Sequence, residues 1–164
     1  MTEEGLRAEI LAFFAQHNVM SLATSAPDGK PHAANLMFAN EGFVLYWVSA
    51  PDSRHSRHIE ADPRVAASVA PDYGDYKDIR GLQIAGTARR VSEPVPAARA
   101  LKLLAAKFGF FGRFLDGPKD LAGDLRKAAV YRLDCETITL IDNTVAFGHK
   151  EVLDLMPRSA DNDS

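Results

Sequence analysis

A short apolar run that leads directly into a basic helix constrains this chain more than any other segment. Phe43 to Val48 (FVLYWV) is rich in aromatic and β-branched residues and too short for a typical helix, so it predicts a strand covered on both faces. Turn formers follow at residues 50–53, with Asp52 or Ser53 placed to cap a helix. That helix should end near Ala61, before an Asp-Pro pair.

The first turn of this predicted helix has an unusual charge. A helix N-terminus carries unpaired N–H groups and a partial positive charge, so it normally attracts acidic side chains. Here it holds Arg54, His55, Arg57 and His58. Two interpretations stay open. The side chains form a solvated basic face offset by nearby carboxylates, or they bind an oxyanion such as a phosphate, which helix ends and arginine forks both favour.

The rest of the pattern predicts a mainly β fold, a six-stranded antiparallel β-barrel with peripheral helices. The first three strands should form a meander, and a phase shift in the last strand predicts a bulge near Glu136 or Thr137. The expected helices are Thr2–Gln16, the basic helix and one capped by Ser92, and the other expected strands are Val19–Thr24, His32–Ala39, Val65–Ala70, Leu82–Val91 and Val130–Ile141.

Length and charge favour one domain that acts on small molecules. The 164 residues predict a single domain over residues 1–157 and a disordered polar tail over 158–164. A net charge of -3, from 19 Lys and Arg against 22 Asp and Glu, argues against nucleic-acid or membrane partners. The single cysteine, Cys135, and the acidic N-terminus predict a cytoplasmic protein without a disulfide framework or secretory signal.

Known catalytic and metal-binding motifs do not identify a function for this sequence. His55 and His58 could meet a metal together with His32 or His149, but the neighbouring arginines would repel a cation, so no metal is expected. Cys135 lies in a predicted strand and is expected to be a buried small hydrophobe. The sequence holds no nucleophile elbow, P-loop or dinucleotide fingerprint. The anion site, if present, is therefore of another kind.

Polar and aromatic residues in the strands suggest which chemical group the ligand carries besides the anion. Asn35 lies in an otherwise apolar strand, where its amide needs a partner or a ligand. Gln83 points away from the core face of its strand. Trp47 alone is best explained as core. Taken together with the basic helix, these residues predict a ligand with a flat ring and a phosphate tail.

Three segments, VMSLATSAPDGKPHAANLMFA, LYWVSAPDSRHSRHIEADPRVAASV and GLQIAGTARRV, resemble the FMN-binding split-barrel family typified by pyridoxamine 5'-phosphate oxidase. The similarity covers residues 17–91 in matching order. It implies a six-stranded split barrel that forms a homodimer with FMN at the interface. By this resemblance, the phosphate is held by Ser53, Arg54 and His55, with support from Arg57. The residues that lie along the isoalloxazine ring are Ala34, Asn35, Leu36, Trp47 and Val48. Gln83 reaches the flavin from the partner subunit.

Two departures from the family narrow the function. His55 stands where the family has lysine, which makes the phosphate contact dependent on pH. The family's C-terminal substrate-binding segment is not recognisable in FGHKEVLDLM, which implies a substrate other than pyridoxamine phosphate. The prediction is an FMN-binding oxidoreductase that transfers hydride to or from a small molecule. Alternatives are a deazaflavin-dependent reductase, a haem-binding or haem-degrading protein with His149 as axial ligand, and a flavin-binding module without turnover.

Overall fold

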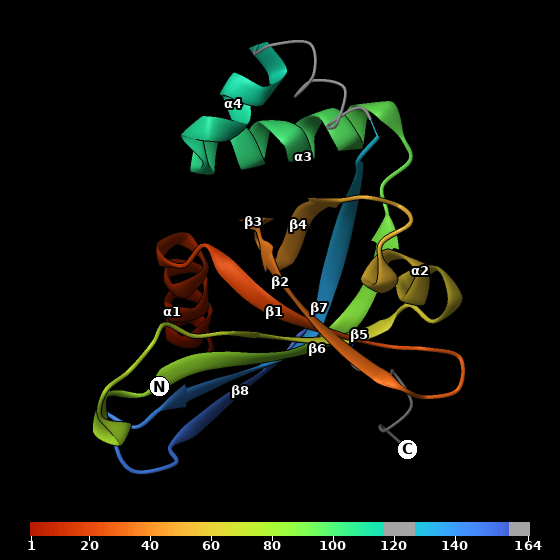
Figure 1. Ribbon diagram of the computed structural model, residues 1–164. Coiled ribbons are helices and arrows are strands. Elements are labelled where there is room, and N and C mark those ends of the chain that lie inside the picture. Colours follow the sequence, from red (N-terminus) through yellow and green to blue (C-terminus); the bar gives the residue numbers. More distant parts are fainter. Residues whose placement is uncertain (117–126, 158–164) are drawn as a thin grey trace, which may run out of the picture.

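The computed structural model describes residues 1–116 and 127–157, which form a curled antiparallel sheet with helices around it (Figure 1). The predicted tail at 158–164 lies outside the described residues. Within the described ranges, no helix combines the length and apolar character needed to span a bilayer. The elements are α1 (Glu3–Gln16), β1 (Val19–Ser25), β2 (Pro31–Met37), β3 (Ala39–Glu41), β4 (Val44–Ser49), α2 (Arg54–Ala61), β5 (Arg64–Val69), η1 (Tyr76–Asp78), β6 (Arg80–Arg90), α3 (Pro94–Lys107), α4 (Gly109–Asp116), β7 (Ala129–Asp142) and β8 (Lys150–Asp154).

The sheet confirms the predicted fold class but not the strand count or every pairing. Eight strands are present, in the order β2-β1-β5-β6-β7-β4-β3, with β8 paired to β7. The predicted strand His32–Ala39 breaks at Phe38, which is fully buried, and its last part becomes β3. The expected meander is wrong, because β4 pairs with β3 and β7 and not with β2. Strand β7, which is distant in the sequence, takes the place beside β4 that β2 would have taken in the meander.

The predicted bulge lies at Glu136. Ala85 pairs with Thr137 and Gly86 pairs with Cys135, so Glu136 has no partner on β6. The backbone of Asp134 comes so close to Gly86 that a Cβ there would overlap with its carbonyl oxygen. A glycine is needed at this position because only it lets the two strands approach where the sheet turns its corner.

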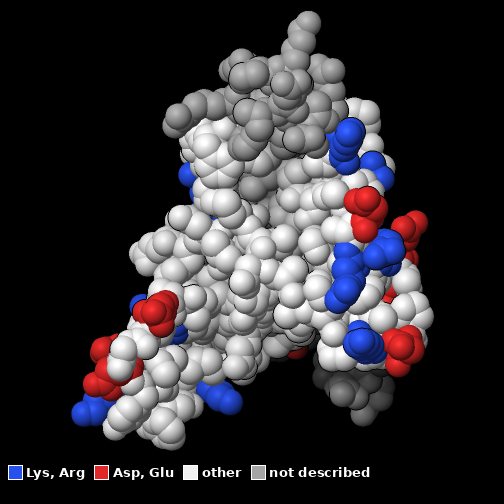
Figure 2. Space-filling view, viewed as in Figure 1, with Lys and Arg blue, Asp and Glu red and all other residues white. Residues whose placement is uncertain are grey.

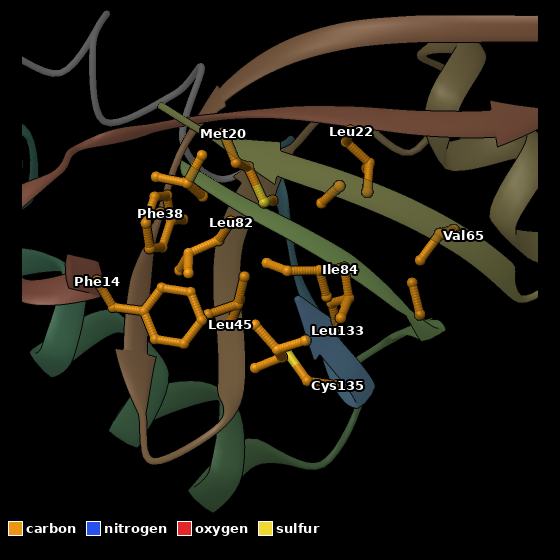
Figure 3. Close-up of a cluster of buried hydrophobic side chains, with 14 of the residues drawn as sticks. Phe14, Met20, Leu22, Phe38, Leu45, Val65, Leu82, Ile84, Leu133 and Cys135 are labelled. Atoms are coloured by element: carbon orange, nitrogen blue, oxygen red, sulfur yellow. The ribbon is translucent and has the colours of Figure 1, made fainter. Parts of the chain in front are cut away.

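The core lies inside the curled sheet and is closed by α1 (Figure 3). Thr2 caps α1 by accepting a hydrogen bond from the Gly5 N–H at 3.0 Å, as predicted. The apolar stripe of this helix, which is buried, consists of Leu6, Ile10, Phe13 and Phe14. From the sheet, Met20, Leu45 and Leu133 are fully buried against it, which fixes how β1, β4 and β7 curl around one cluster.

Helices α3 and α4 cover the other face of β4. Ala39, Leu104, Phe108 and Phe111 form a second buried cluster there, with Val48 packed at its edge. The first helical residue of α3 is Pro94, and its N-cap is Glu93 without a side-chain cap bond, so the prediction of Ser92 as cap is wrong. Proline at the first helical position explains this, because it fixes the entry angle without a cap. The coverage by α3 is why β4 is shielded on both faces.

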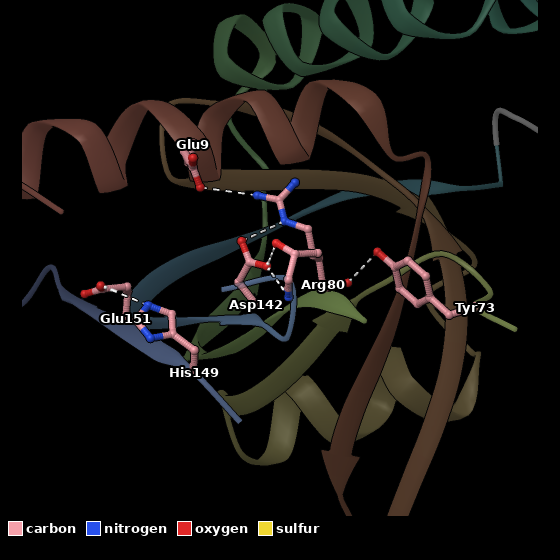
Figure 4. A network of polar contacts seen from close by, with 7 residues as sticks. Glu9, Tyr73, Arg80, Asp142, His149 and Glu151 are labelled. Atoms are coloured by element: carbon pink, nitrogen blue, oxygen red, sulfur yellow. Dashed lines mark hydrogen bonds and ion pairs between the residues drawn. The ribbon is translucent and has the colours of Figure 1, made fainter. Parts of the chain in front are cut away.

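A polar network ties α1 to the ends of β6 and β7 (Figure 4). Arg80 donates to Asp142 through Nε at 3.0 Å and to Glu9 through Nη2 at 3.3 Å. Burial raises the pKa of Asp142, but bonds from Thr144 and the charge of Arg80 outweigh it and hold that pKa below its usual value. The network is structural, since it closes the end of the barrel beside α1.

Candidate functional site

Four residues separate the end of β4 from the first turn of α2, which presents unpaired positive charge. Ser53 is the N-cap: its Oγ accepts from the Ser56 N–H at 3.3 Å and donates to the Ser56 Oγ at 2.7 Å. Arg54 and Arg57 are exposed, and neither forms an ion pair or hydrogen bond with a side chain in the described part of the chain. Two guanidinium groups at a capped helix start therefore remain available to an anion.

Three histidines surround the inner side of this helix start. His55 is half-buried, and its Nε2 lies 2.8 Å from the Ser49 Oγ and 3.3 Å from the Ser53 Oγ. Its pKa is lowered from 6.5, first by burial and then by the nearby His32 and His58. The His58 ring lies 5.8 Å from the His32 ring, edge to face. Mutual repulsion and burial keep His55 neutral at neutral pH in the free protein.

A hydrogen bond anchors α2 to the sheet beside this cluster. His58 Nδ1 lies 2.9 Å from the Oγ1 of Thr24, a buried residue of β1. His32 belongs to β2, so α2 begins where β1 and β2 present these side chains. Among the residues that the structure describes, no three histidine, cysteine, aspartate or glutamate side chains are grouped to hold a metal ion. The cluster is suited to hydrogen bonding and protonation.

Cross-strand pairing places a row of small polar side chains on the exposed face of the sheet. Ser21 pairs with Asn35 and with Ser68, and Ser68 pairs with Gln83. The Ser21 Oγ donates to the Asn35 Oδ1 at 2.7 Å. A parallel row of alanines lies beside it, made of Ala33, Ala23, Ala66 and Ala85. This part of the sheet is therefore flat, and hydrogen-bonding groups line it along one side.

A shallow depression of about 390 Å³ lies over these rows. Asn35 follows His32 by three residues on β2, so the two side chains leave opposite faces of the strand. His32 lies on the side of α2, and Asn35 lies in the exposed polar row. In Figure 2 the charged side chains gather at the margins, including the side where α2 lies, and the middle of the face is uncharged.

Comparison with known proteins decides the family. A family profile described as pyridoxamine 5'-phosphate oxidase matches residues 6–142, most of the chain. This protein belongs to the pyridoxamine 5'-phosphate oxidase family. It is 40% identical over 94 residues to the pyridoxine/pyridoxamine 5'-phosphate oxidase of Rubrobacter xylanophilus, a match that covers 56% of this chain and 39% of that protein. The aligned region thus spans well under half the length of that relative.

Solved structures of other proteins share the fold at low sequence identity. The protein Rv2991 of Mycobacterium tuberculosis superposes with a TM-score of 0.70 at 22% identity, over 90% of this chain and 92% of that one. HutZ, the haem storage protein of Vibrio cholerae, superposes with a TM-score of 0.66 at 21% identity, over 80% and 90% of the two chains. The family and the split-barrel fold predicted from the sequence are confirmed.

The structure brings the predicted phosphate residues together and separates the predicted ring residues. Ser53, Arg54, His55 and Arg57 lie at one helix start, while Asn35 and Gln83 lie in the exposed polar row. The side chains of Ala34 and Leu36 alternate with Asn35 and are half-buried, so only the backbone of this stretch borders the polar row. Val48 is half-buried under α3, on the other side of β4.

The side chain of Trp47 lies in the core of the chain. It is fully buried by the chain itself and stacks on Tyr131 with ring centroids 5.9 Å apart. Its Nε1 is the buried side-chain nitrogen that finds no partner among the described residues. The Trp47 side chain belongs to the core because alternation along β4 points it inward with Leu45, so only its backbone is placed to border a ligand.

Sequence reasoning missed part of the site. Ser21 and Ser68 became visible only through the pairing of β1 and β5, and Thr24 only through its bond to His58. The signal that was present is the alternation of serine and alanine with buried apolar residues on β1 and β5. His149 does not join the site: its Nε2 lies 3.2 Å from the Glu151 Oε1, and β8 lies across the molecule from α2 (Figures 1 and 4).

Proposed function

We propose that this protein is an FMN-binding oxidoreductase that transfers hydride between the flavin and a small molecule. The observation that carries the proposal is the pair of unpartnered arginines at the capped start of α2, in a chain whose sheet also carries a flat exposed row of hydrogen-bonding side chains. Membership of the pyridoxamine 5'-phosphate oxidase family supports it. A phosphate tail and a planar ring fit these two surfaces.

Different residues would bind the phosphate and the ring of the cofactor. Arg54 and Arg57 would neutralise the phosphate, and the Ser53 hydroxyl and the free N–H groups of α2 would donate to its oxygens. Asn35, Ser21 and Gln83 would hydrogen-bond the polar edge of the ring. The bound flavin itself supplies the hydride chemistry, whereas the protein supplies binding and orientation. No described side chain is assigned as a catalytic acid or base.

We further propose that two copies pair over the uncharged sheet face, with the cofactor at the interface. Small side chains in two adjacent rows let another surface approach closely, and Asn35 and Gln83 offer it hydrogen bonds. A single chain leaves the ring surface open on one side, so a second copy would complete the site and exclude water. The substrate differs from pyridoxamine phosphate, since the C-terminal segment lacks the expected arginine and histidine pattern.

A comparison of FMN with riboflavin tests the phosphate site. Arg54→Gln should weaken FMN binding by about 1.5–3 kcal/mol, the range for a charge-assisted hydrogen bond, and should leave riboflavin unchanged. Lys102→Gln on α3, an exposed lysine without an ion pair among the described residues, is the charge-matched control. Equal FMN affinity in wild type and Arg54→Gln would remove the helix start as the phosphate site.

The likeness to a haem storage protein makes haem the second candidate. The Nε2 of His149 is engaged by Glu151, so ligation through that nitrogen requires this contact to break. The visible spectrum of the purified protein separates the two: a two-band flavin spectrum supports the proposal, and a Soret band that His149→Ala abolishes supports haem. Mass measurement of the released pigment distinguishes FMN from a deazaflavin.

A further inference from the structure

A second cavity, of about 450 Å³, lies between α2, the end of β6 and the start of β7. Its volume is within the usual range for small-molecule sites. Its lining combines apolar and charged side chains: Pro51, Ser56, Ile59, Glu60, Pro63, Ala88, Arg89, Arg90, Ser92 and Tyr131. Neither the predicted function nor the family match assigns a ligand to it.

Tyr131 supplies an unsatisfied polar group to this cavity. The residue is only 4% exposed, yet its hydroxyl has no hydrogen-bond partner among the described residues. It is not sealed from solvent as the Trp47 N–H is, and it borders the cavity. The hydroxyl is therefore open to the cavity, where it can donate to or accept from a ligand or a water molecule.

Arg90 lies directly beside Tyr131. The two residues are cross-strand partners on β6 and β7, so their side chains leave the same face of the sheet, with Cβ atoms about 5 Å apart. Arg90 forms no ion pair with a described residue, whereas Arg89 lies 3.7 Å from Glu93. Arg90 is therefore the cation of the lining that remains available to an acid group in the cavity.

The cavity is separate from the phosphate site. Successive residues of an α-helix are 100° apart, which places Ile59 on the side of α2 opposite to Arg54 and Arg57, whereas Glu60 lies beside Arg57 at the rim of the cavity. The two sites share only the cap, through the bond from the Ser53 Oγ to the Ser56 Oγ. A ligand in the cavity would leave both phosphate-binding arginines free.

We propose that this cavity binds a small aromatic carboxylic acid, independently of the flavin. The carboxylate accepts hydrogen bonds from Arg90 and from the Tyr131 hydroxyl, which a single acid group can reach together. The ring packs against Ile59, Pro63 and Ala88. The proposal goes beyond flavin binding and does not depend on it, because none of these residues belongs to the helix start or to the polar row.

Fluorescence titration with 2-naphthoate tests the site. The wild-type protein should bind this probe, and its neutral analogue 2-naphthamide should bind at least tenfold more weakly. Arg90→Gln should weaken 2-naphthoate binding about tenfold, because it removes a charge-assisted bond at a partly exposed site. Tyr131→Phe, which keeps the ring and its stacking on Trp47, should weaken binding about fivefold.

Controls make each outcome decisive. Lys102→Gln makes the same charge change as Arg90→Gln outside the cavity and should bind the probe like wild type. Saturating FMN should leave probe binding unchanged. The proposal is overturned if wild type does not bind 2-naphthoate, if Arg90→Gln behaves like Lys102→Gln, or if FMN displaces the probe. Loss of FMN binding with probe binding intact would count against the flavin function alone.

Discussion

FMN binding should weaken as the pH rises from 6.5 to 8, because His55 occupies the helix start. Its pKa lies below 6.5 in the free protein, through burial first and then through the positive charges that His32 and His58 can carry. A phosphate at the start of α2 adds negative charge beside the ring and favours protonation. Binding therefore takes up a proton over the range between the pKa of the free protein and that of the complex.

The size of the effect follows from simple electrostatics. A unit charge pair 4 Å apart at an effective dielectric constant of 20 interacts by about 4 kcal/mol, so a phosphate bound beside His55 would raise the pKa of that imidazole. Because binding takes up one proton, each unit of rising pH weakens it by up to about tenfold, so the dissociation constant for FMN should rise by up to about 30-fold between pH 6.5 and 8.

Flavin fluorescence quenching measures this directly. Riboflavin is the matched control, because it carries the same ring without the phosphate and should show a flat profile. His55→Lys keeps its charge across this pH range and should bind FMN with little dependence on pH. The reasoning fails if FMN affinity in wild type is constant over this range, or if riboflavin follows the same curve. Calorimetry in two buffers of different ionisation enthalpy counts the protons independently.

Two further predictions test the fold and the candidate site. Gly86→Ala should lower the free energy of unfolding by about 3 kcal/mol in urea denaturation, since its Cβ would overlap with the Asp134 carbonyl, while Gly81→Ala, with looser contacts, should cost clearly less. Trp47→Phe should leave FMN affinity within about twofold in the same fluorescence titration, because the side chain is fully buried. A large loss of FMN affinity in folded Trp47→Phe would restore Trp47 to the site.

Features set by neighbours along the chain could be predicted from the sequence. The cap at Ser53 follows from a serine before a basic amphipathic run, and the outward position of Gln83 follows from strict alternation with Leu82 and Ile84. The bulge at Glu136 follows from a one-residue phase shift. Each of these signals lies within about a dozen residues, where periodicity and turn chemistry decide the structure.

Features set by distant pairing could not be predicted in this way. Nothing near β4 indicates that its partner is β7, more than eighty residues later, because buried strands of similar composition are interchangeable in pattern. Trp47 alone is best explained as core, but only that pairing fixes which face of β4 is inside. Strands β3 and β8 are short, and short strands carry little periodicity.

The difference between local and long-range features affects how substitutions can change the proposed site. The proposed phosphate anchor lies within five consecutive residues, from Ser53 to Arg57, whereas the polar row is assembled from β1, β2, β5 and β6. A substitution at the helix start can therefore alter phosphate affinity and its pH dependence without disturbing the ring surface. Histidine at position 55 is such a local change. The family's lysine is charged at neutral pH, whereas this histidine becomes charged only when a bound phosphate favours its protonation. FMN and riboflavin should for that reason respond differently to pH in one protein.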